Sequence, residues 1–339
     1  MEITIWFWLG FLGFVFLLLA FDLGVLHRKP KAVSVREALY LSLFYVAIAA
    51  VFNVGVFAFL GKQAGYEFMT GYLIEKSLSL DNIFVFVLIF THFAVPPQYQ
   101  HRVLFWGILG ALVMRGLLIF AGAALISSVH WVVLIFGAFL IFTGIKMLVS
   151  VGAEPDLENN RIIRFARRRL RVTPDYHGSR FFTRENGLLL VTPLFLVLVV
   201  VEFTDLVFAL DSIPAIFAIT PEPFIVFTAN VFAILGLRAL YFALAGIIHR
   251  FHYLKYGLSL VLCVVGIKMI VNGAFGDKVI PTEIALAITA GLIGGSIALS
   301  LIKTKMRLGE PIPEPRFTGW VPGSTKRRAK PSGGKDAGP

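Results

Sequence analysis

The sequence has few charged residues and almost no cysteine, and both shortages exclude whole classes of protein. Only 15% of its 339 residues are charged, whereas 58% are hydrophobic. A water-soluble domain does not carry so large an apolar share, because its surface needs polar side chains. The one cysteine, Cys263, lies in an apolar run, so a disulfide framework and a cysteine metal cluster are excluded. The chain is expected to be an integral membrane protein.

Histidine is scarce as well. All seven histidines lie at the ends of apolar segments or in the loops between them. Imidazole is a common ligand of zinc and haem iron, so neither is expected in the middle of the membrane. Met147 and Met269 each follow a lysine and are interpreted as packing residues. No tightly bound cofactor is predicted.

Long apolar runs dominate what is present, and nine of them are long enough to cross a bilayer as helices. The predicted spans are residues 3–26, 37–60, 67–93, 103–126, 131–150, 187–211, 224–248, 256–273 and 281–302. They predict an all-α, polytopic membrane protein whose transmembrane domain covers residues 1–303 and includes a basic loop at 151–186. The tail at 304–339 is rich in proline and basic residues and is predicted to be disordered.

Lysine and arginine are distributed unevenly between the two sides of the membrane. If the N-terminus is outside, the inside segments hold 24 of the 31 basic residues, and the outside segments hold only Lys62 and Lys278. Cytoplasmic loops carry this excess in membrane proteins, which predicts an outside N-terminus and a cytoplasmic C-terminus. The net charge of +11 therefore reflects membrane orientation. The lipid bilayer is the expected partner, and nucleic acid is not.

Two of the apolar segments contain clustered carboxylates. The first, EKSLSLDNIFVFVLI, carries Glu75 and Asp81, and the second, EFTDLVFALDSIPAIFAI, carries Glu202, Asp205 and Asp211. Placing one carboxylate at mid-bilayer depth costs about 2.5–3.5 kcal/mol even on lenient scales. Such groups are therefore neutralised, paired with a base or bound to a cation, and these clusters are the main indication of function.

Five basic residues fall inside predicted spans: Lys76, Arg115, Lys146, Arg238 and Lys268. A purely structural interpretation pairs them with the carboxylates. A functional interpretation is favoured, because ionisable residues inside spans commonly mark ion or substrate pathways. All except Lys76 are predicted charge partners of the acids. The two arginines are also expected to replace a cation in one conformational state.

The sequence contains an internal repeat. The hexamer GIKMLV returns as GIKMIV 122 residues later, and Asp81 matches Asp211 at an offset of 130 residues. Two three-span units are therefore predicted, at 67–150 and 187–273. Because each unit has an odd number of spans, the second is expected to lie inverted relative to the first. Inverted repeats form many secondary transporters, which bind substrate at the repeat interface near the midplane.

A proline in the second acidic segment predicts a break in its helix. Pro214 cannot donate a hydrogen bond to the carbonyl of Leu210, so the helix is expected to kink or unwind beside Asp211 and Ser212. Broken helices of this kind expose backbone carbonyls in transporters. In the first segment, Ser77, Ser79 and Asn82 are expected to loosen the helix by competing for backbone hydrogen bonds.

The polar side chains of both segments form a set of hard oxygen ligands. Such oxygens suit Mg²⁺, Ca²⁺ or Mn²⁺ better than zinc, copper or iron–sulfur centres. The predicted metal-binding residues are Glu75, Asp81, Asn82, Asp205, Asp211 and Ser212. Three further residues are candidates for the ion pathway: Asp22, Glu202 and Asn230. The residues alone leave the choice among the three ions open, and none is assigned a catalytic role.

Two stretches, EKSLSLDNIFVF and FTDLVFALDSIPAIFAIT, resemble the two signature segments of the TerC family of bacterial integral membrane proteins. That family includes the tellurite-resistance TerC proteins and the Alx-like manganese exporters. The resemblance covers all nine predicted spans. It implies an inverted-repeat transporter in the bacterial inner membrane and, for the manganese-handling members, export of Mn²⁺ by the intramembrane acids. It implies nothing about the basic loop or the tail.

Three functions are compatible with these residues. The favoured one is export of a divalent cation, Mn²⁺ first, in exchange for protons carried by intramembrane carboxylates. An alternative is a tellurium-linked role or export of a small organic solute, in which Arg115 and Arg238 would bind a carboxylate or oxyanion. A third is an intramembrane aspartyl protease with Asp81 and Asp211 as its pair, although the additional acids argue against it. The chain is therefore not expected to be an enzyme.

Overall fold

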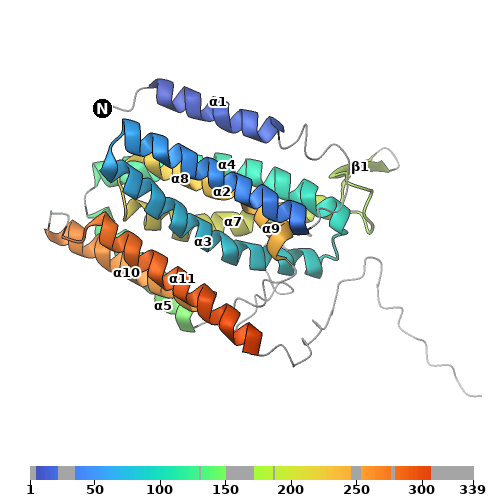
Figure 1. Cartoon of the computed structure of the whole chain (residues 1–339). Coiled ribbons are helices and arrows are strands. Elements are labelled where there is room, and N and C mark those ends of the chain that lie inside the picture. The colour runs from blue at the N-terminus through green and yellow to red at the C-terminus, as the bar shows by residue number, and fades with distance from the viewer. Residues whose placement is uncertain are drawn as a thin grey trace, which may run out of the picture.

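The computed structural model describes residues 5–21, 35–129, 131–149, 172–185, 188–245, 253–275 and 279–306, which form a bundle of helices and one small hairpin (Figure 1). The elements are α1 (Ile5–Phe21), α2 (Val35–Phe59), α3 (Lys62–His92), α4 (Pro97–Ser128), α5 (Val132–Val149), β1 (Phe182–Glu185), β2 (Leu188–Val191), α7 (Pro193–Phe217), α8 (Pro223–Leu235), α9 (Leu237–Leu244), α10 (Leu254–Phe275) and α11 (Thr282–Met306). Asp22, most of the basic loop and the tail beyond residue 306 lie outside the described residues.

Seven of the described helical segments are long and apolar enough to cross a membrane, counting α8 and α9 as one. The 17-residue α1 is a shorter apolar helix. The 31-residue α3 is long enough but carries the charged side chains of the first acidic segment. With α1 and α3, the seven segments match the nine predicted spans in order. The prediction of an all-α, polytopic membrane protein is confirmed.

Prolines mark the start of three helices. Pro97, Pro193 and Pro223 each lie in the first turn of α4, α7 and α8, where a missing N–H leaves no hydrogen bond unmade. The predicted start of the sixth span, residue 187, is wrong, because α7 begins only at Pro193. The chain before Pro193 is extended, as expected for a residue that precedes proline, and β2 there pairs with β1 in an antiparallel hairpin.

The predicted break beside Asp211 is absent, and the real break lies in the next span. Helix α7 continues through Pro214 to Phe217. Pro214 lies in the last turn of α7, so only three residues of the helix follow it, and the surrounding turn is buried. The interruption falls instead at Gly236, so the predicted span 224–248 consists of α8 and α9.

Helix α3 is also continuous, contrary to the predicted loosening by its serines. Ser77 Oγ donates to the carbonyl of Leu73 at 2.6 Å, and Ser79 Oγ donates to the carbonyl of Glu75 at 2.8 Å. Both hydroxyls therefore bond to the preceding turn and leave the helix intact. The acids are brought together by the packing of continuous helices, without an unwound segment.

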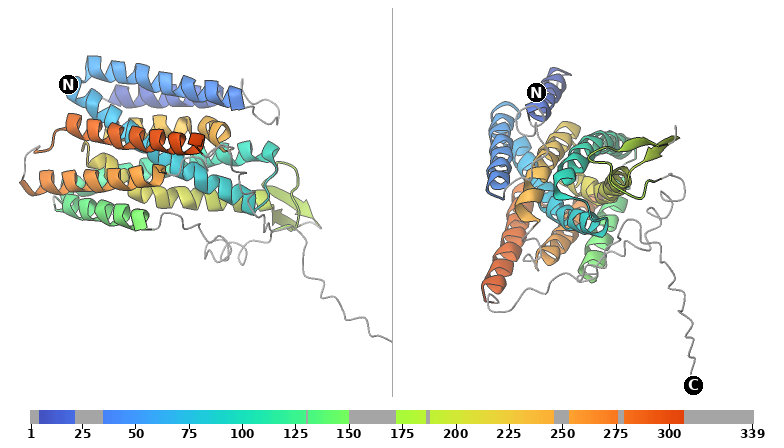
Figure 2. Two further views of the ribbon diagram at one scale, coloured as in Figure 1. Left: turned by 60° about the horizontal axis from the view of Figure 1, so that its bottom comes forward. Right: turned by 90° about the vertical axis from the view of Figure 1, so that its right-hand side faces the viewer.

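The central position in the bundle belongs to α8 and α9. Within the combined span Pro223–Leu244, 94% of the most apolar stretch is buried. Helices α1 and α2 lie on one side of this centre, and α5, α10 and α11 lie on the other (Figures 1 and 2). Large apolar side chains cover the outside, including Trp6, Leu17, Val51 and Phe142, each at least 64% exposed. A lipid environment satisfies such a surface, since the backbone hydrogen bonds are made inside the helices.

Small residues bring α5 and α10 together. A Cβ on Gly144 would lie 2.8 Å from the carbonyl oxygen of Ser259, and one on Gly266 would lie 2.7 Å from that of Gly137. The contacts are reciprocal, because the 122-residue repeat matches Gly144 with Gly266 and Gly137 with Ser259. Two units related by a two-fold axis make contacts of this kind. The inverted repeat itself stays a prediction, which superposing the two units would test.

The close approach of α5 and α10 makes Gly266 sensitive to any added atom. Gly266→Ala is expected to destabilise the protein by about 1–3 kcal/mol, the usual cost of overpacking, because the new methyl group would meet backbone. Gly291→Ala on α11 is the matched control, since its methyl group would meet nothing within 4 Å. Thermal unfolding of both purified variants measures the difference, and equal stabilities would contradict the close packing.

Candidate functional site

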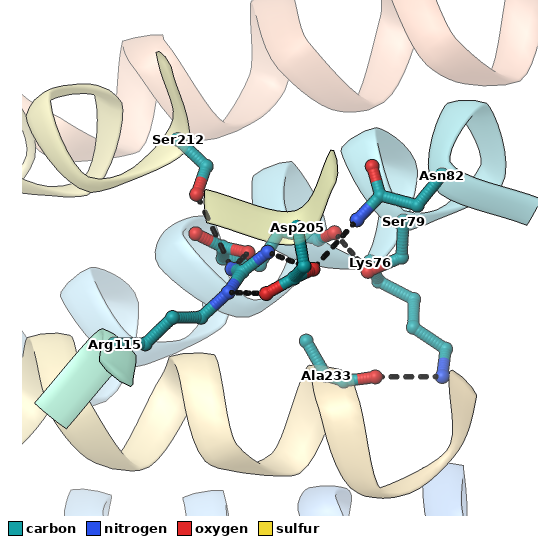
Figure 3. Close-up of polar contacts among 8 residues, drawn as sticks. Lys76, Ser79, Asn82, Arg115, Asp205, Ser212 and Ala233 are labelled. Carbon is teal, nitrogen blue, oxygen red and sulfur yellow. Dashed lines mark hydrogen bonds and ion pairs between the residues drawn. The ribbon is translucent and has the colours of Figure 1, made fainter. Parts of the chain in front are cut away.

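Arg115 of α4 lies buried between α3 and α7 and joins one acid from each. Its Nη2 donates to Asp205 Oδ1 at 3.0 Å and its Nε donates to Asp205 Oδ2 at 3.1 Å, so this pair is bidentate. Its Nη1 donates to Glu75 Oε2 at 2.9 Å and to Ser212 Oγ at 3.3 Å. Figure 3 shows the guanidinium pointing at Asp205, with Ser212 beside it.

These charges are fully inside the protein. Glu75 is 1% exposed, Arg115 is 2% exposed and Asp205 is 3% exposed. Removing ions from water is costly, and attraction between them compensates only when the geometry is good and further hydrogen bonds are made. The bidentate fork of Arg115 supplies that geometry. Two carboxylates and one guanidinium still leave a net charge of −1 if both acids are ionised.

A cavity of about 390 Å³ lies beside Arg115. Its polar lining residues are Glu75, Asp81, Asn82, Arg115, Thr143, Lys146, Asp211 and Ser212. Five of the six predicted metal-binding residues are therefore brought to one cavity. The sixth, Asp205, is buried against Arg115 next to it.

Two residues that line this cavity each carry a buried oxygen whose hydrogen bonding is incomplete. In the described part of the chain, Glu75 Oε1 and Asn82 Oδ1 have no hydrogen-bond partner. The amide of Asn82 is oriented by its nitrogen, which donates to Asp205 Oδ1 at 3.4 Å. A buried polar atom without a partner costs about 1–3 kcal/mol. Both oxygens belong to residues that line the cavity, so a donor or a cation there would recover this cost.

The two remaining aspartates of the cavity have partners that sequence reasoning missed. Asp211 Oδ1 accepts a hydrogen bond from Thr143 Oγ1 at 3.3 Å. Asp81 Oδ1 lies 4.0 Å from Lys255 Nζ, with 21% and 28% of the two side chains exposed. The position of Thr143, one turn before Lys146 on α5, was a usable signal. Lys255 gave no such signal, because it lies in a segment that the sequence predicts to be a cytoplasmic loop.

Lys76 has a structural role at the break between α8 and α9. Its Nζ donates to the carbonyl of Ala233 at 3.3 Å (Figure 3). Gly236 leaves room for it, since a Cβ there would lie 2.6 Å from Nζ. A positive charge at the C-terminal end of α8 is favourable to the helix dipole. The structural interpretation, in which every intramembrane base pairs with an acid, is therefore wrong for Lys76 within the described residues.

Other predicted pathway and charge-partner residues lie away from this cavity. Glu202 faces a separate apolar groove between α4 and α7, where its carboxylate is packed against Gly110. Asn230, Arg238 and Lys268 are buried in α8, α9 and α10 and are not among the cavity-lining residues. Of the predicted charge partners, Arg115 and Lys146 line the cavity.

The cavity does not present a ready-made cluster of acidic metal ligands. Among the described residues, no group of three or more His, Cys, Asp or Glu side chains is close enough to hold a metal ion. Arg115 takes up one oxygen of Glu75 and both of Asp205, while Asp81 and Asp211 face partners on α10 and α5. Binding an ion to several of these acids would require them to move toward one another.

The chain is similar to a known family of membrane proteins and to several of their individual sequences. The family model described as "Integral membrane protein TerC family" matches residues 60–308. The "Uncharacterized membrane protein STKORF319" of Myxococcus xanthus is 53% identical over 299 residues, which cover 88% of this chain and 92% of the relative. Proteins of Salmonella typhi and Escherichia coli K12 named "Putative membrane-bound redox modulator Alx" are 44% identical over 304 residues, covering 87% of this chain and 92% of each. No solved structure matches.

Proposed function

Because the chain belongs to the TerC family of integral membrane proteins, we propose that it transports a divalent metal cation through the cavity beside Arg115. Mn²⁺ is the first candidate, and protons are the proposed counter-ions. The bacterial inner membrane is the proposed location, with the N-terminus outside and the C-terminus in the cytoplasm. The metal is cargo in this proposal, and no tightly bound cofactor is part of it.

The proposal rests above all on the oxygen-rich wall of the cavity. Carboxylate, amide and hydroxyl oxygens from Glu75, Asp81, Asn82, Asp211 and Ser212 line one space. Mg²⁺, Ca²⁺ and Mn²⁺ favour oxygen ligands of this kind. Intramembrane acids that face a cavity are also the usual markers of an ion or proton pathway. The unpartnered oxygens of Glu75 and Asn82 give a cation its first points of attachment.

Arg115 supplies the internal positive charge in this mechanism. Its guanidinium holds Glu75 and Asp205 together, as a divalent cation would if the same carboxylates turned toward the cavity. The arginine and the metal would therefore neutralise the acids in alternating conformations. Protons on the carboxylates would serve the same purpose during the return step, which is how exchange with protons would be coupled to transport.

Two alternative functions fit the cavity less well. An oxyanion or organic acid needs an arginine with several free donors, whereas four of the five N–H groups of Arg115 already donate to Glu75, Asp205 and Ser212. An aspartyl protease needs two carboxylates that share one proton. Asp81 and Asp211 contact separate partners, and no hydrogen bond joins them in the described structure.

Ion flux into sealed vesicles tests the proposal directly. The purified full-length protein in proteoliposomes is expected to carry Mn²⁺ with a simultaneous pH change inside the vesicles. Parallel measurements with Ca²⁺, Mg²⁺ and Zn²⁺ rank the ions, and Zn²⁺ is expected to be the poorest of the four. Protein-free vesicles serve as the control. Absence of protein-dependent flux for all four ions would refute cation transport.

A further inference from the structure

The two partly exposed aspartates of the cavity are each held by the third helix of the other repeat unit. Asp81 on α3 faces Lys255 on α10, and Asp211 on α7 accepts a hydrogen bond from Thr143 on α5. Of the described helices, α5 and α10 pack against each other more extensively than any other pair. The same aspartates that line the cavity therefore also connect the α5/α10 pair to α3 and α7.

Lys255 occupies a position that its own helix disfavours. It lies in the first turn of α10, which begins at Leu254, where the helix dipole opposes a positive charge. Two groups on α3 compensate. The carboxylate of Asp81 lies 4.0 Å from Nζ, and the ring centroid of Phe84 lies 4.6 Å from it. Asp81 and Phe84 are three residues apart and share one face of α3, so the ammonium rests against that face.

The ion pair of Asp81 and Lys255 is partly exposed, and Asp81 is the member of the pair that lines the cavity. About a fifth of the Asp81 side chain and just over a quarter of the Lys255 side chain remain exposed, in contrast to the fully buried Arg115 and its two acids. Lys146, which lines the cavity near Asp211, belongs to the same end of the antiparallel α5/α10 pair. Lys255 is the base that faces Asp81 from α10, with Nζ 4.0 Å from Oδ1.

We propose that Lys255 is a specificity-determining residue that competes with the substrate cation for Asp81. This inference rests on the proposed function of the cavity. A divalent cation that binds Asp81 displaces the lysine, and this displacement removes the ionic contact between α3 and α10. Binding of the substrate is thereby coupled to release of the α5/α10 pair, and a cation too weakly charged to displace the lysine leaves the contact in place.

Mn²⁺ binding by a Lys255 variant tests the competition. Lys255→Met keeps the length of the side chain and removes its charge. The variant is expected to bind Mn²⁺ about 1.5- to fivefold more tightly than the unmodified protein, the range that a partly exposed ion pair contributes. Titrating the purified full-length protein with Mn²⁺, while following the electron paramagnetic resonance signal of the free ion, gives the dissociation constant without transport.

Lys303→Met is the matched control. Lys303 also lies over an aromatic ring, with Nζ 4.8 Å from the ring centroid of Tyr253 and 3.1 Å from its hydroxyl. No carboxylate in the described residues pairs with it, so its loss is expected to leave Mn²⁺ affinity unchanged. In an Asp81→Asn background, Lys255→Met is expected to have no further effect on affinity, because the two residues act on each other.

The outcomes separate this inference from the function on which it rests. If Lys255→Met binds Mn²⁺ no more tightly than the unmodified protein, the competition is refuted and cation transport stands. If the unmodified protein binds no Mn²⁺, the proposed function fails for this ion and the inference fails with it. Lys255→Gln carries the same expectation and replaces the methionine variant if that variant cannot be purified in folded form.

Discussion

Replacing either Asp81 or Asp211 with asparagine is expected to lower Mn²⁺ flux in proteoliposomes about ten- to 100-fold. Each change keeps the size of the side chain and one oxygen, but it removes a negative charge from the cavity wall. Charged hydrogen-bond partners are worth about 1.5–3 kcal/mol, which corresponds to this range of rates. Expression and membrane insertion are expected to be largely unaffected, because neither aspartate takes part in the buried contacts of Arg115.

Glu202→Gln is the matched control for these aspartates. It makes the same chemical change on α7, but its carboxylate lies in the separate groove between α4 and α7. Flux by this variant is expected to stay within about twofold of the unmodified rate, since Glu202 is not among the residues that line the cavity and a change away from a site is usually worth less than about 0.5 kcal/mol. If Asp81→Asn and Asp211→Asn both transport at the unmodified rate, the aspartates are structural and the cation-site proposal is wrong.

The order of the helices and the choice of acids could be predicted because both depend on local patterns. Apolar runs of membrane-spanning length need no knowledge of tertiary packing, and they match the described helices in order. The acids stood out because a carboxylate inside such a run is costly. Their repetition then indicated a shared site, and Glu75, Asp81 and Asp211 do line one cavity.

Contacts between distant helices could not be predicted from the same patterns. Pro214 predicts a break, yet α7 continues through its buried turn to Phe217, whereas the next span is interrupted at Gly236, where there is no proline. Lys255 looked like one of several bases in an inside loop, and only the packing of α10 against α3 brings it to Asp81. Glu202 was a candidate for the ion pathway on sequence alone, but its carboxylate packs against Gly110 in the separate groove between α4 and α7.

Removal of Arg115 is expected to have the largest effect on stability. Arg115→Met should destabilise the protein by about 3–5 kcal/mol, because it leaves two buried carboxylates without their counter-charge. Both acids bind the guanidinium directly, at 2.9 Å for Glu75 and 3.0 Å for Asp205. Chemical denaturation of the purified protein in detergent measures the loss. A variant that also carries Glu75→Gln and Asp205→Asn should recover most of it, since replacing all members of a buried ionic group is often close to neutral.

The response of Arg115→Met to Mn²⁺ shows whether the arginine and a metal serve the same acids. If they do, a cation that binds the folded protein will restore stability, by about 2.7 kcal/mol when its concentration is 100 times the dissociation constant. The triple variant lacks both inner carboxylates and should gain less. If Mn²⁺ does not stabilise Arg115→Met while the triple variant recovers as expected, Arg115 is a structural partner of Glu75 and Asp205 and does not take the place of a transported cation.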